Sequence, residues 1–79
     1  MKRRRADGLN ATPVGCTVTL TAVGLAAAER LRLAELGLRA GAVITVLART
    51  AGGGRLLGIG TSRIAVDRAT AQLLAVEAA

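Results

Sequence analysis

The feature that most constrains the fold is a leucine-rich segment that meets two glycines, four residues apart, just before an apolar stretch. The segment is RLAELGLRAG over residues 32–41. Gly37 is predicted to end a helix, because glycine reaches a positive φ without a Cβ clash. Gly41 then turns the chain into a predicted strand over residues 42–49. By local pattern alone the segment indicates a helix-to-strand connection.

The composition limits the core to aliphatic side chains. The chain has 79 residues, with ten glycines, one proline and no aromatic residue, so one small domain is expected. Without aromatic side chains the chain cannot build the stacking platforms that hold single-stranded nucleic acid, nor the aromatic grooves that hold proline-rich peptides.

The residues that usually carry catalysis or hold metals are scarce. The chain has no histidine and one cysteine, so neither a zinc ligand set nor a Cys–His or Ser–His–Asp nucleophile system is available. Cys16 begins an alternating stretch and is predicted to be a small buried hydrophobe. The acidic residues are scattered, and Glu29 and Glu35 point about 240° apart on a helix. We therefore predict no catalytic residues, no metal site, no cofactor and no small-molecule substrate.

The positive charge is concentrated at the start of the chain. The formal net charge is +6, and residues 2–5 supply four of the eleven positive charges. Residues 1–8 are interpreted as a disordered basic tail, with weak binding to nucleic acid or anionic lipid as the alternative. The uncharged stretch that follows holds several threonines, and its longest apolar run, residues 22–28, is too short for membrane insertion.

The alternation of polar and apolar residues, in segments separated by glycines, predicts five strands after the tail. Threonines alternate with apolar residues in the first strand, residues 16–23. The remaining predicted strands cover residues 42–49, 55–60, 63–66 and 73–77. The glycines at 52–54 are interpreted as a flexible hairpin loop, since no helix and no Gly-Lys-Ser/Thr sequence follows to make a phosphate loop.

Two helices are predicted between the strands. One covers residues 26–36, with Leu33 and Leu36 on one imperfect apolar face, so it is expected to lie outside the barrel. A shorter helix over residues 68–72 follows Asp67, which is predicted to cap it. The predicted fold is mainly β: a small SH3-like barrel of about five strands in residues 9–79, with one external helix after the first strand and a short helix before the last.

The chain resembles the FeoA-like family over residues 9–77. The family pattern R-L-x-x-L-G-L-x-P-G matches at Arg32 and at the structural signature residues, which are Leu33, Leu36, Gly37, Leu38 and Gly41. The opening PVG and the closing strand–helix–strand order also match. Ala40 replaces the usual proline, and Asp67 stands where the family often has arginine.

The resemblance implies a bacterial cytoplasmic accessory protein of ferrous-iron transport, which binds a FeoB-type, GTPase-fused membrane transporter. Arg30, Arg32 and Arg39 are the candidate partner-binding residues, and they are expected to form one positive patch; each alone could equally serve solubility. The alternative is a stand-alone regulatory module, since the same barrel resembles the C-terminal domain of iron-dependent repressors. In that case the basic tail would add weak, salt-sensitive binding to DNA.

Overall fold

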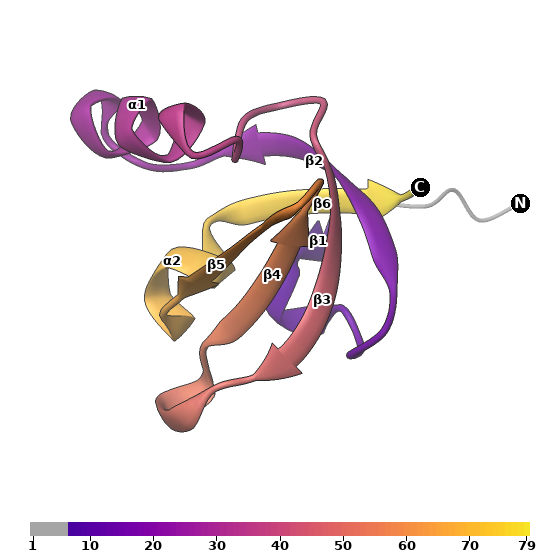
Figure 1. The fold of residues 1–79 in the computed structure, drawn as a ribbon. Helices are drawn as coiled ribbons and strands as arrows, with labels where there is room; N and C mark the ends of the chain where they lie inside the picture. Colours follow the sequence, from indigo (N-terminus) through magenta and orange to yellow (C-terminus); the bar gives the residue numbers. More distant parts are fainter. Residues whose placement is uncertain (1–6) are drawn as a thin grey trace, which may run out of the picture.

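The computed structural model describes residues 7–79, and a single antiparallel sheet forms its framework (Figure 1). The strands follow the order β1-β6-β2-β3-β4-β5 across the sheet. They are β1 (Asp7–Gly8), β2 (Thr17–Val23), β3 (Val43–Arg49), β4 (Arg55–Ile59), β5 (Ser62–Val66) and β6 (Leu74–Ala78). The helices are α1 (Ala27–Glu35) and α2 (Arg68–Gln72), and two 3₁₀ turns are η1 (Leu9–Ala11) and η2 (Ala51–Gly53).

The sheet bends at two irregularities in strand pairing. The register of β2 against β6 shifts between Leu20 and Ala22, and that of β3 against β4 shifts between Val46 and Ala48. An extra residue on one strand bends it and increases its twist, and here the bends curl the sheet into an SH3-like barrel. The predicted fold class, a mainly β SH3-like barrel with an external helix and a short helix before the last strand, is confirmed. The prediction was about five strands with the external helix after the first; β1 adds a sixth, so α1 follows the second strand, β2.

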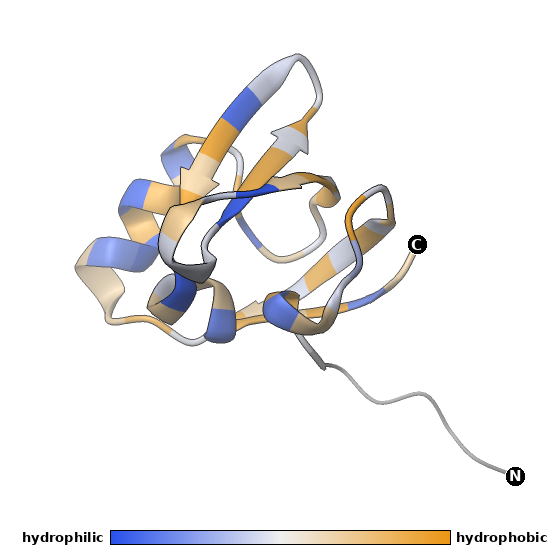
Figure 2. Ribbon diagram, turned by 90° about the horizontal axis from the view of Figure 1, so that it is seen from below, coloured by the Kyte–Doolittle hydropathy of each residue, from blue (hydrophilic) through white to orange (hydrophobic). Residues whose placement is uncertain are grey.

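The core lies inside the curled sheet and follows the alternation of the strands. Val18 and Leu20 of β2 face inward with Ile44 and Val46 of β3, and hydrophobic and polar bands alternate along the strands in Figure 2. Between them Thr45 turns outward, where its hydroxyl pairs with that of Thr17 at 2.9 Å. The fully buried large side chains are Leu9, Leu20, Leu38, Ile44, Val46, Leu57 and Leu74. Burial of each contributes about 1.5–3 kcal/mol to the stability of the fold. The chain thus obtains its hydrophobic stabilisation from aliphatic side chains alone.

Two expectations for the N-terminal part of the chain differ from the structure. The predicted tail extended to residue 8, but Asp7 and Gly8 form β1 and pair with Val76 and Ala75 of β6; residues 1–6 of that tail lie outside the described residues. Cys16 was predicted to be buried and is exposed. β2 begins one residue later, after Gly15 at φ +96°, so the inward–outward alternation does not yet apply to Cys16.

Candidate functional site

The signature segment forms a glycine-capped helix end that joins the barrel. Leu38 N–H donates to the Leu33 carbonyl at 2.9 Å, and Gly37 N–H donates to the Ala34 carbonyl at 3.0 Å. These two bonds define the Schellman motif, and Gly37 has the positive φ, +101°, that the motif requires. Leu38 is fully buried, and Leu33 packs against the core. The predicted glycine cap is therefore present, and it fixes where α1 leaves the barrel.

Gly37→Ala should lower the free energy of unfolding by about 1 kcal/mol, because a β-carbon is strained at this φ. The added methyl would also lie 3.4 Å from Cγ2 of Ile59, at the limit of ordinary contact. Thermal unfolding followed by circular dichroism should show the midpoint about 4–8 °C lower, the usual shift for a domain of this size. An unchanged midpoint would contradict the cap.

α1 stands out from the barrel and exposes apolar side chains. None of its residues is buried (Figure 1). Leu31 is 63% exposed and Leu36, at the helix end, is 52% exposed. Leu36 was expected to share a barrel-facing side with Leu33, and this is wrong, because the glycine turn follows it at once and Leu38 takes the buried position. The helix end thus leaves two large apolar side chains largely in contact with solvent.

The three predicted contact arginines are exposed but point in different directions. Arg30 and Arg32 are two residues apart on α1, which places them about 200° apart around the helix axis. Arg32 lines a small cavity of about 180 Å³ with Leu33 and with Thr70 of α2, whereas Arg30 does not. Arg39 lies beyond the glycine turn, between Leu38 and Gly41. Arg30 and Arg32 therefore leave α1 on different sides, and Arg39 follows the turn at the end of the helix.

Asp67 caps α2, as predicted. Its Oδ1 accepts a hydrogen bond from Thr70 N–H at 2.7 Å. This bond favours the ionised carboxylate and lowers the pKa of Asp67 below its ordinary value of 3.8. The residue that stands where the FeoA pattern often has arginine thus has a structural function in this chain.

Because the folded-state pKa of Asp67 is depressed, its contribution to stability is present above pH 3.8 and is lost as the pH falls through the folded-state pKa. Asp67→Ala should therefore lower the melting temperature at pH 7, and the difference from wild type should shrink progressively below pH 3.8. Melting curves between pH 7 and pH 2 would measure this. A difference that stays constant across that range would contradict the charged cap.

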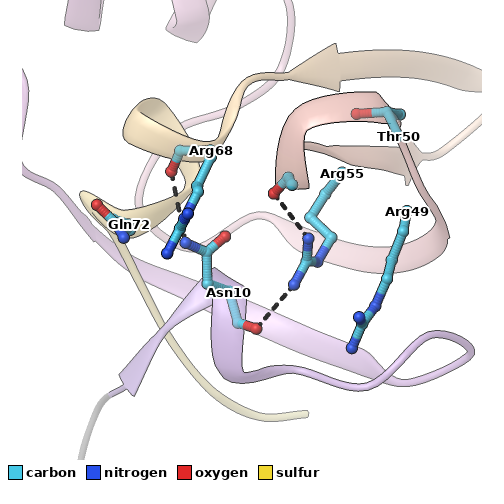
Figure 3. Close-up of a pocket in the computed structure, with 7 residues that line it drawn as sticks. Asn10, Arg49, Thr50, Arg55, Arg68 and Gln72 are labelled. Atoms are coloured by element: carbon cyan, nitrogen blue, oxygen red, sulfur yellow. Dashed lines mark hydrogen bonds between the residues drawn. The ribbon is translucent and has the colours of Figure 1, made fainter.

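A basic pocket lies on the side of the barrel where η1, η2 and α2 meet (Figure 3). Its volume is about 500 Å³. It is lined by Asn10, Arg49, Thr50, Gly53, Arg55, Arg68 and Gln72. The Arg55 side chain lies between those of Arg49 and Arg68 in Figure 3. Arg49 and Arg68 are exposed, but Arg55 is only 6% exposed. None of the described residues that line the pocket is acidic.

Backbone carbonyl oxygens hold the guanidinium of Arg55. Nη1 donates to the carbonyls of Gly53 and Gly54 at 2.8 and 2.9 Å, and Nη2 donates to the carbonyl of Asn10 at 3.0 Å. Arg55 thereby links β4 to η1. Because η1 follows β1, these bonds connect the β4–β5 end of the strand order to its β1 end. Its Nε is buried without a hydrogen-bond partner, as is Oδ1 of Asn10.

The glycine triplet forms the predicted hairpin loop between β3 and β4, and Gly53 and Gly54 pack against neighbouring groups. Thr50 N–H donates to the Gly54 carbonyl at 3.0 Å, and Gly53 N–H donates to the Thr50 carbonyl at 3.2 Å. A methyl group at Gly53 would lie 3.1 Å from Cδ of Arg68, so the turn and that side chain are in contact. Sequence reasoning missed the basic pocket, because its three arginines are far apart in sequence; the one local signal was a glycine turn directly before an arginine.

The structure shows neither a metal-binding cluster nor a membrane-spanning helix within residues 7–79. No group of three or more His, Cys, Asp or Glu side chains is close enough together there to hold a metal ion. In the same part of the chain, neither helix has the length and hydropathy needed to cross a bilayer.

Strand order, external helix and short final helix define the class of the protein: a small SH3-like barrel. The family model described as the FeoA domain matches residues 8–78. Because this match covers most of the chain, the chain belongs to the FeoA domain family. A comparison with curated proteins finds no match.

Solved structures with the same fold include FeoA proteins and a manganese-dependent repressor. The FeoA protein of Chlorobium tepidum, solved by NMR, is 26% identical with a TM-score of 0.83, covering 90% of this chain and 69% of that one. A crystal structure of an iron uptake regulatory protein (FeoA) is 22% identical, with a TM-score of 0.80, covering 94% and 97%. A manganese-dependent transcriptional repressor is 26% identical, with a TM-score of 0.81, covering 99% of this chain but only 44% of its own length.

Proposed function

We propose that this protein is a cytoplasmic accessory protein of bacterial ferrous-iron transport, which acts by binding the cytoplasmic face of a FeoB-type transporter. Membership of the FeoA domain family supports the link to iron transport. The observation that carries the binding mechanism is α1, which has no buried residue and exposes Leu31. Because α1 buries none of its residues, it contributes little to the stability of the barrel. The exposed face of α1 is available to a partner.

The chemistry of α1 fits a partner surface that is both apolar and acidic. Leu31 would fill an apolar depression, since a few well-packed side chains dominate most interfaces. Arg30, Arg32 and Arg39 would surround it with positive charge, of which the exposed Glu29 and Glu35 offset two units, so that the net local charge is +1. The partner is expected to carry Asp and Glu around that depression. The protein performs no chemistry of its own in this account and alters the transporter by binding alone.

The second candidate is a stand-alone regulatory module that binds nucleic acid. The observation that favours it is the likeness to the manganese-dependent repressor, of which this chain spans 44%. In this account the positive charges of residues 2–5 would hold DNA, with an affinity that falls steeply with salt.

A pull-down with two variants separates these functions. One variant replaces Arg30, Arg32 and Arg39 by serine, and the other lacks residues 2–5. Under the transport proposal, the serine variant is retained less by the transporter's cytoplasmic domain, while the deletion variant is retained like wild type. If the transporter domain does not retain even the wild-type protein, and the deletion abolishes retention on duplex DNA, the regulatory function replaces the proposal.

A further inference from the structure

We propose that the basic pocket binds the phosphate group of a small molecule. This inference concerns the side of the barrel that carries η2 and α2, and it does not depend on how α1 docks. Three guanidinium groups from the end of β3, the start of β4 and the start of α2 line one cavity (Figure 3). Packing three like charges together is unfavourable unless a counter-charge joins them.

Arg55 is the central group in this arrangement. Its side chain is more than nine-tenths buried, and all three hydrogen bonds of its guanidinium go to neutral carbonyl oxygens. Burial of a charge is costly without an opposite charge nearby. Asp67 lies beside this turn, its Cα 3.3 Å from the position of a Cβ at Gly54, but it is exposed and its Oδ1 accepts a hydrogen bond from Thr70 N–H. The positive charge of Arg55 is therefore available to an anion from outside.

The remaining polar atoms of the pocket also suit an oxyanion. Nε of Arg55 is a buried donor with no acceptor. Arg49 and Arg68 lie on either side of Arg55 with exposed side chains, so they can close on a ligand that Arg55 anchors. Thr50 and Gln72 add a hydroxyl and an amide at the rim. Donors of this kind exclude a metal cation and match phosphate oxygens, which accept bidentate bonds from arginine.

The size of the pocket and the composition of the chain define the ligand further. A volume of about 500 Å³ lies within the range of ordinary small-molecule sites, so the pocket has room for an inorganic phosphate or for the phosphates of a larger ester. The chain has no aromatic residue to stack on a base. Recognition should therefore stop at the phosphate groups, and pyrophosphate should bind about as tightly as ATP.

NMR titration of the whole protein at constant ionic strength tests this proposal. Inorganic phosphate, pyrophosphate and ATP are each exchanged for chloride while amide shifts are followed. The expected result is a saturable shift of the amides of Gly53, Gly54 and Arg55, with a dissociation constant of about 1 mM or lower for pyrophosphate. Agreement between pyrophosphate and ATP supports recognition of phosphate alone, and much tighter binding of ATP contradicts it.

A matched pair of variants distinguishes a built site from general charge. Arg49→Gln/Arg68→Gln leaves Arg55 in place and should weaken pyrophosphate binding about tenfold or more, since it removes two groups that donate charge-assisted hydrogen bonds. Arg30→Gln/Arg63→Gln removes the same charge elsewhere and should leave binding unchanged. Phosphate should also raise the melting temperature of wild type and of this control, but not that of the pocket variant. Equal weakening in both variants, or no saturable shift with any of the three ligands, would overturn the proposal.

Discussion

Gly54→Ala should destabilise the protein more than any other single glycine-to-alanine substitution in the η2 turn. Gly54 has an ordinary extended backbone, φ −76° and ψ −175°, so only space is at issue. A methyl group there would overlap Oγ1 of Thr50 and would lie 2.5 Å from the carbonyl oxygen of Val66. Because the latter atom is backbone, the turn and β5 would have to separate, at a cost of about 3 kcal/mol. For a small domain this is a large part of the total stability.

Gly52→Ala provides the matched control in the same turn. Gly52 has φ +77°, and no atom lies within 4 Å of an added β-carbon. It should therefore cost only the backbone strain, about 1 kcal/mol. Urea unfolding of the two variants would give the difference directly. Equal midpoints for the two variants would mean that Gly54 is not packed between Thr50 and β5, and that the base of the Arg55 site is less constrained than described.

Replacing Arg30, Arg32 and Arg39 together by serine should slow association with the transporter's cytoplasmic domain by about tenfold at low salt. The physical reason is that exposed charges steer the encounter, whatever face of α1 each of them occupies. The effect should fade as salt rises, since the screening length is only about 8 Å at physiological ionic strength. Stopped-flow or surface-based kinetics at several salt concentrations would measure it. Stability should change little, because exposed charges contribute little to folding.

Two further variants give this experiment its controls. Arg63→Ser removes an exposed charge from β5 and should leave the association rate close to that of wild type. Leu31→Ser should instead speed dissociation, because it removes apolar contact without changing charge. An unchanged association rate in the triple variant would show that the three arginines are only a solvated surface, even if the transporter does bind.

Local pattern was enough to place most of the fold. The predicted strand over residues 42–49 is β3 (Val43–Arg49), and the helix over 26–36 is α1 (Ala27–Glu35). Such elements were predictable because alternation and glycine stops act over a few residues. β1 was not, since two residues after a basic run carry no periodicity and pair only because β6 lies beside them. The predictions for Cys16 and Leu36 were wrong for a related reason. Each residue lies at the end of a strand or helix, where the periodicity of that element no longer determines which side chains are buried.

The candidate sites depended on contacts that sequence does not reveal. Arg30, Arg32 and Arg39 could be found from their nearness to the glycine signature, but their different directions come from the helix geometry. The basic pocket was out of reach, because Asn10 and Arg68 are joined to Arg55 only through the closure of the barrel. Asp67 was predictable as a cap because its partner, Thr70, is three residues away.

Calorimetric titration of the purified protein into the cytoplasmic domain of a FeoB-type transporter tests the central claim most directly. We expect saturable one-to-one binding at physiological salt. We also expect the affinity to fall in the Arg30/Arg32/Arg39 serine variant and in Leu31→Ser, and to stay unchanged when residues 2–5 are removed. Absence of binding to the transporter domain, with duplex DNA bound through residues 2–5 instead, would contradict the account.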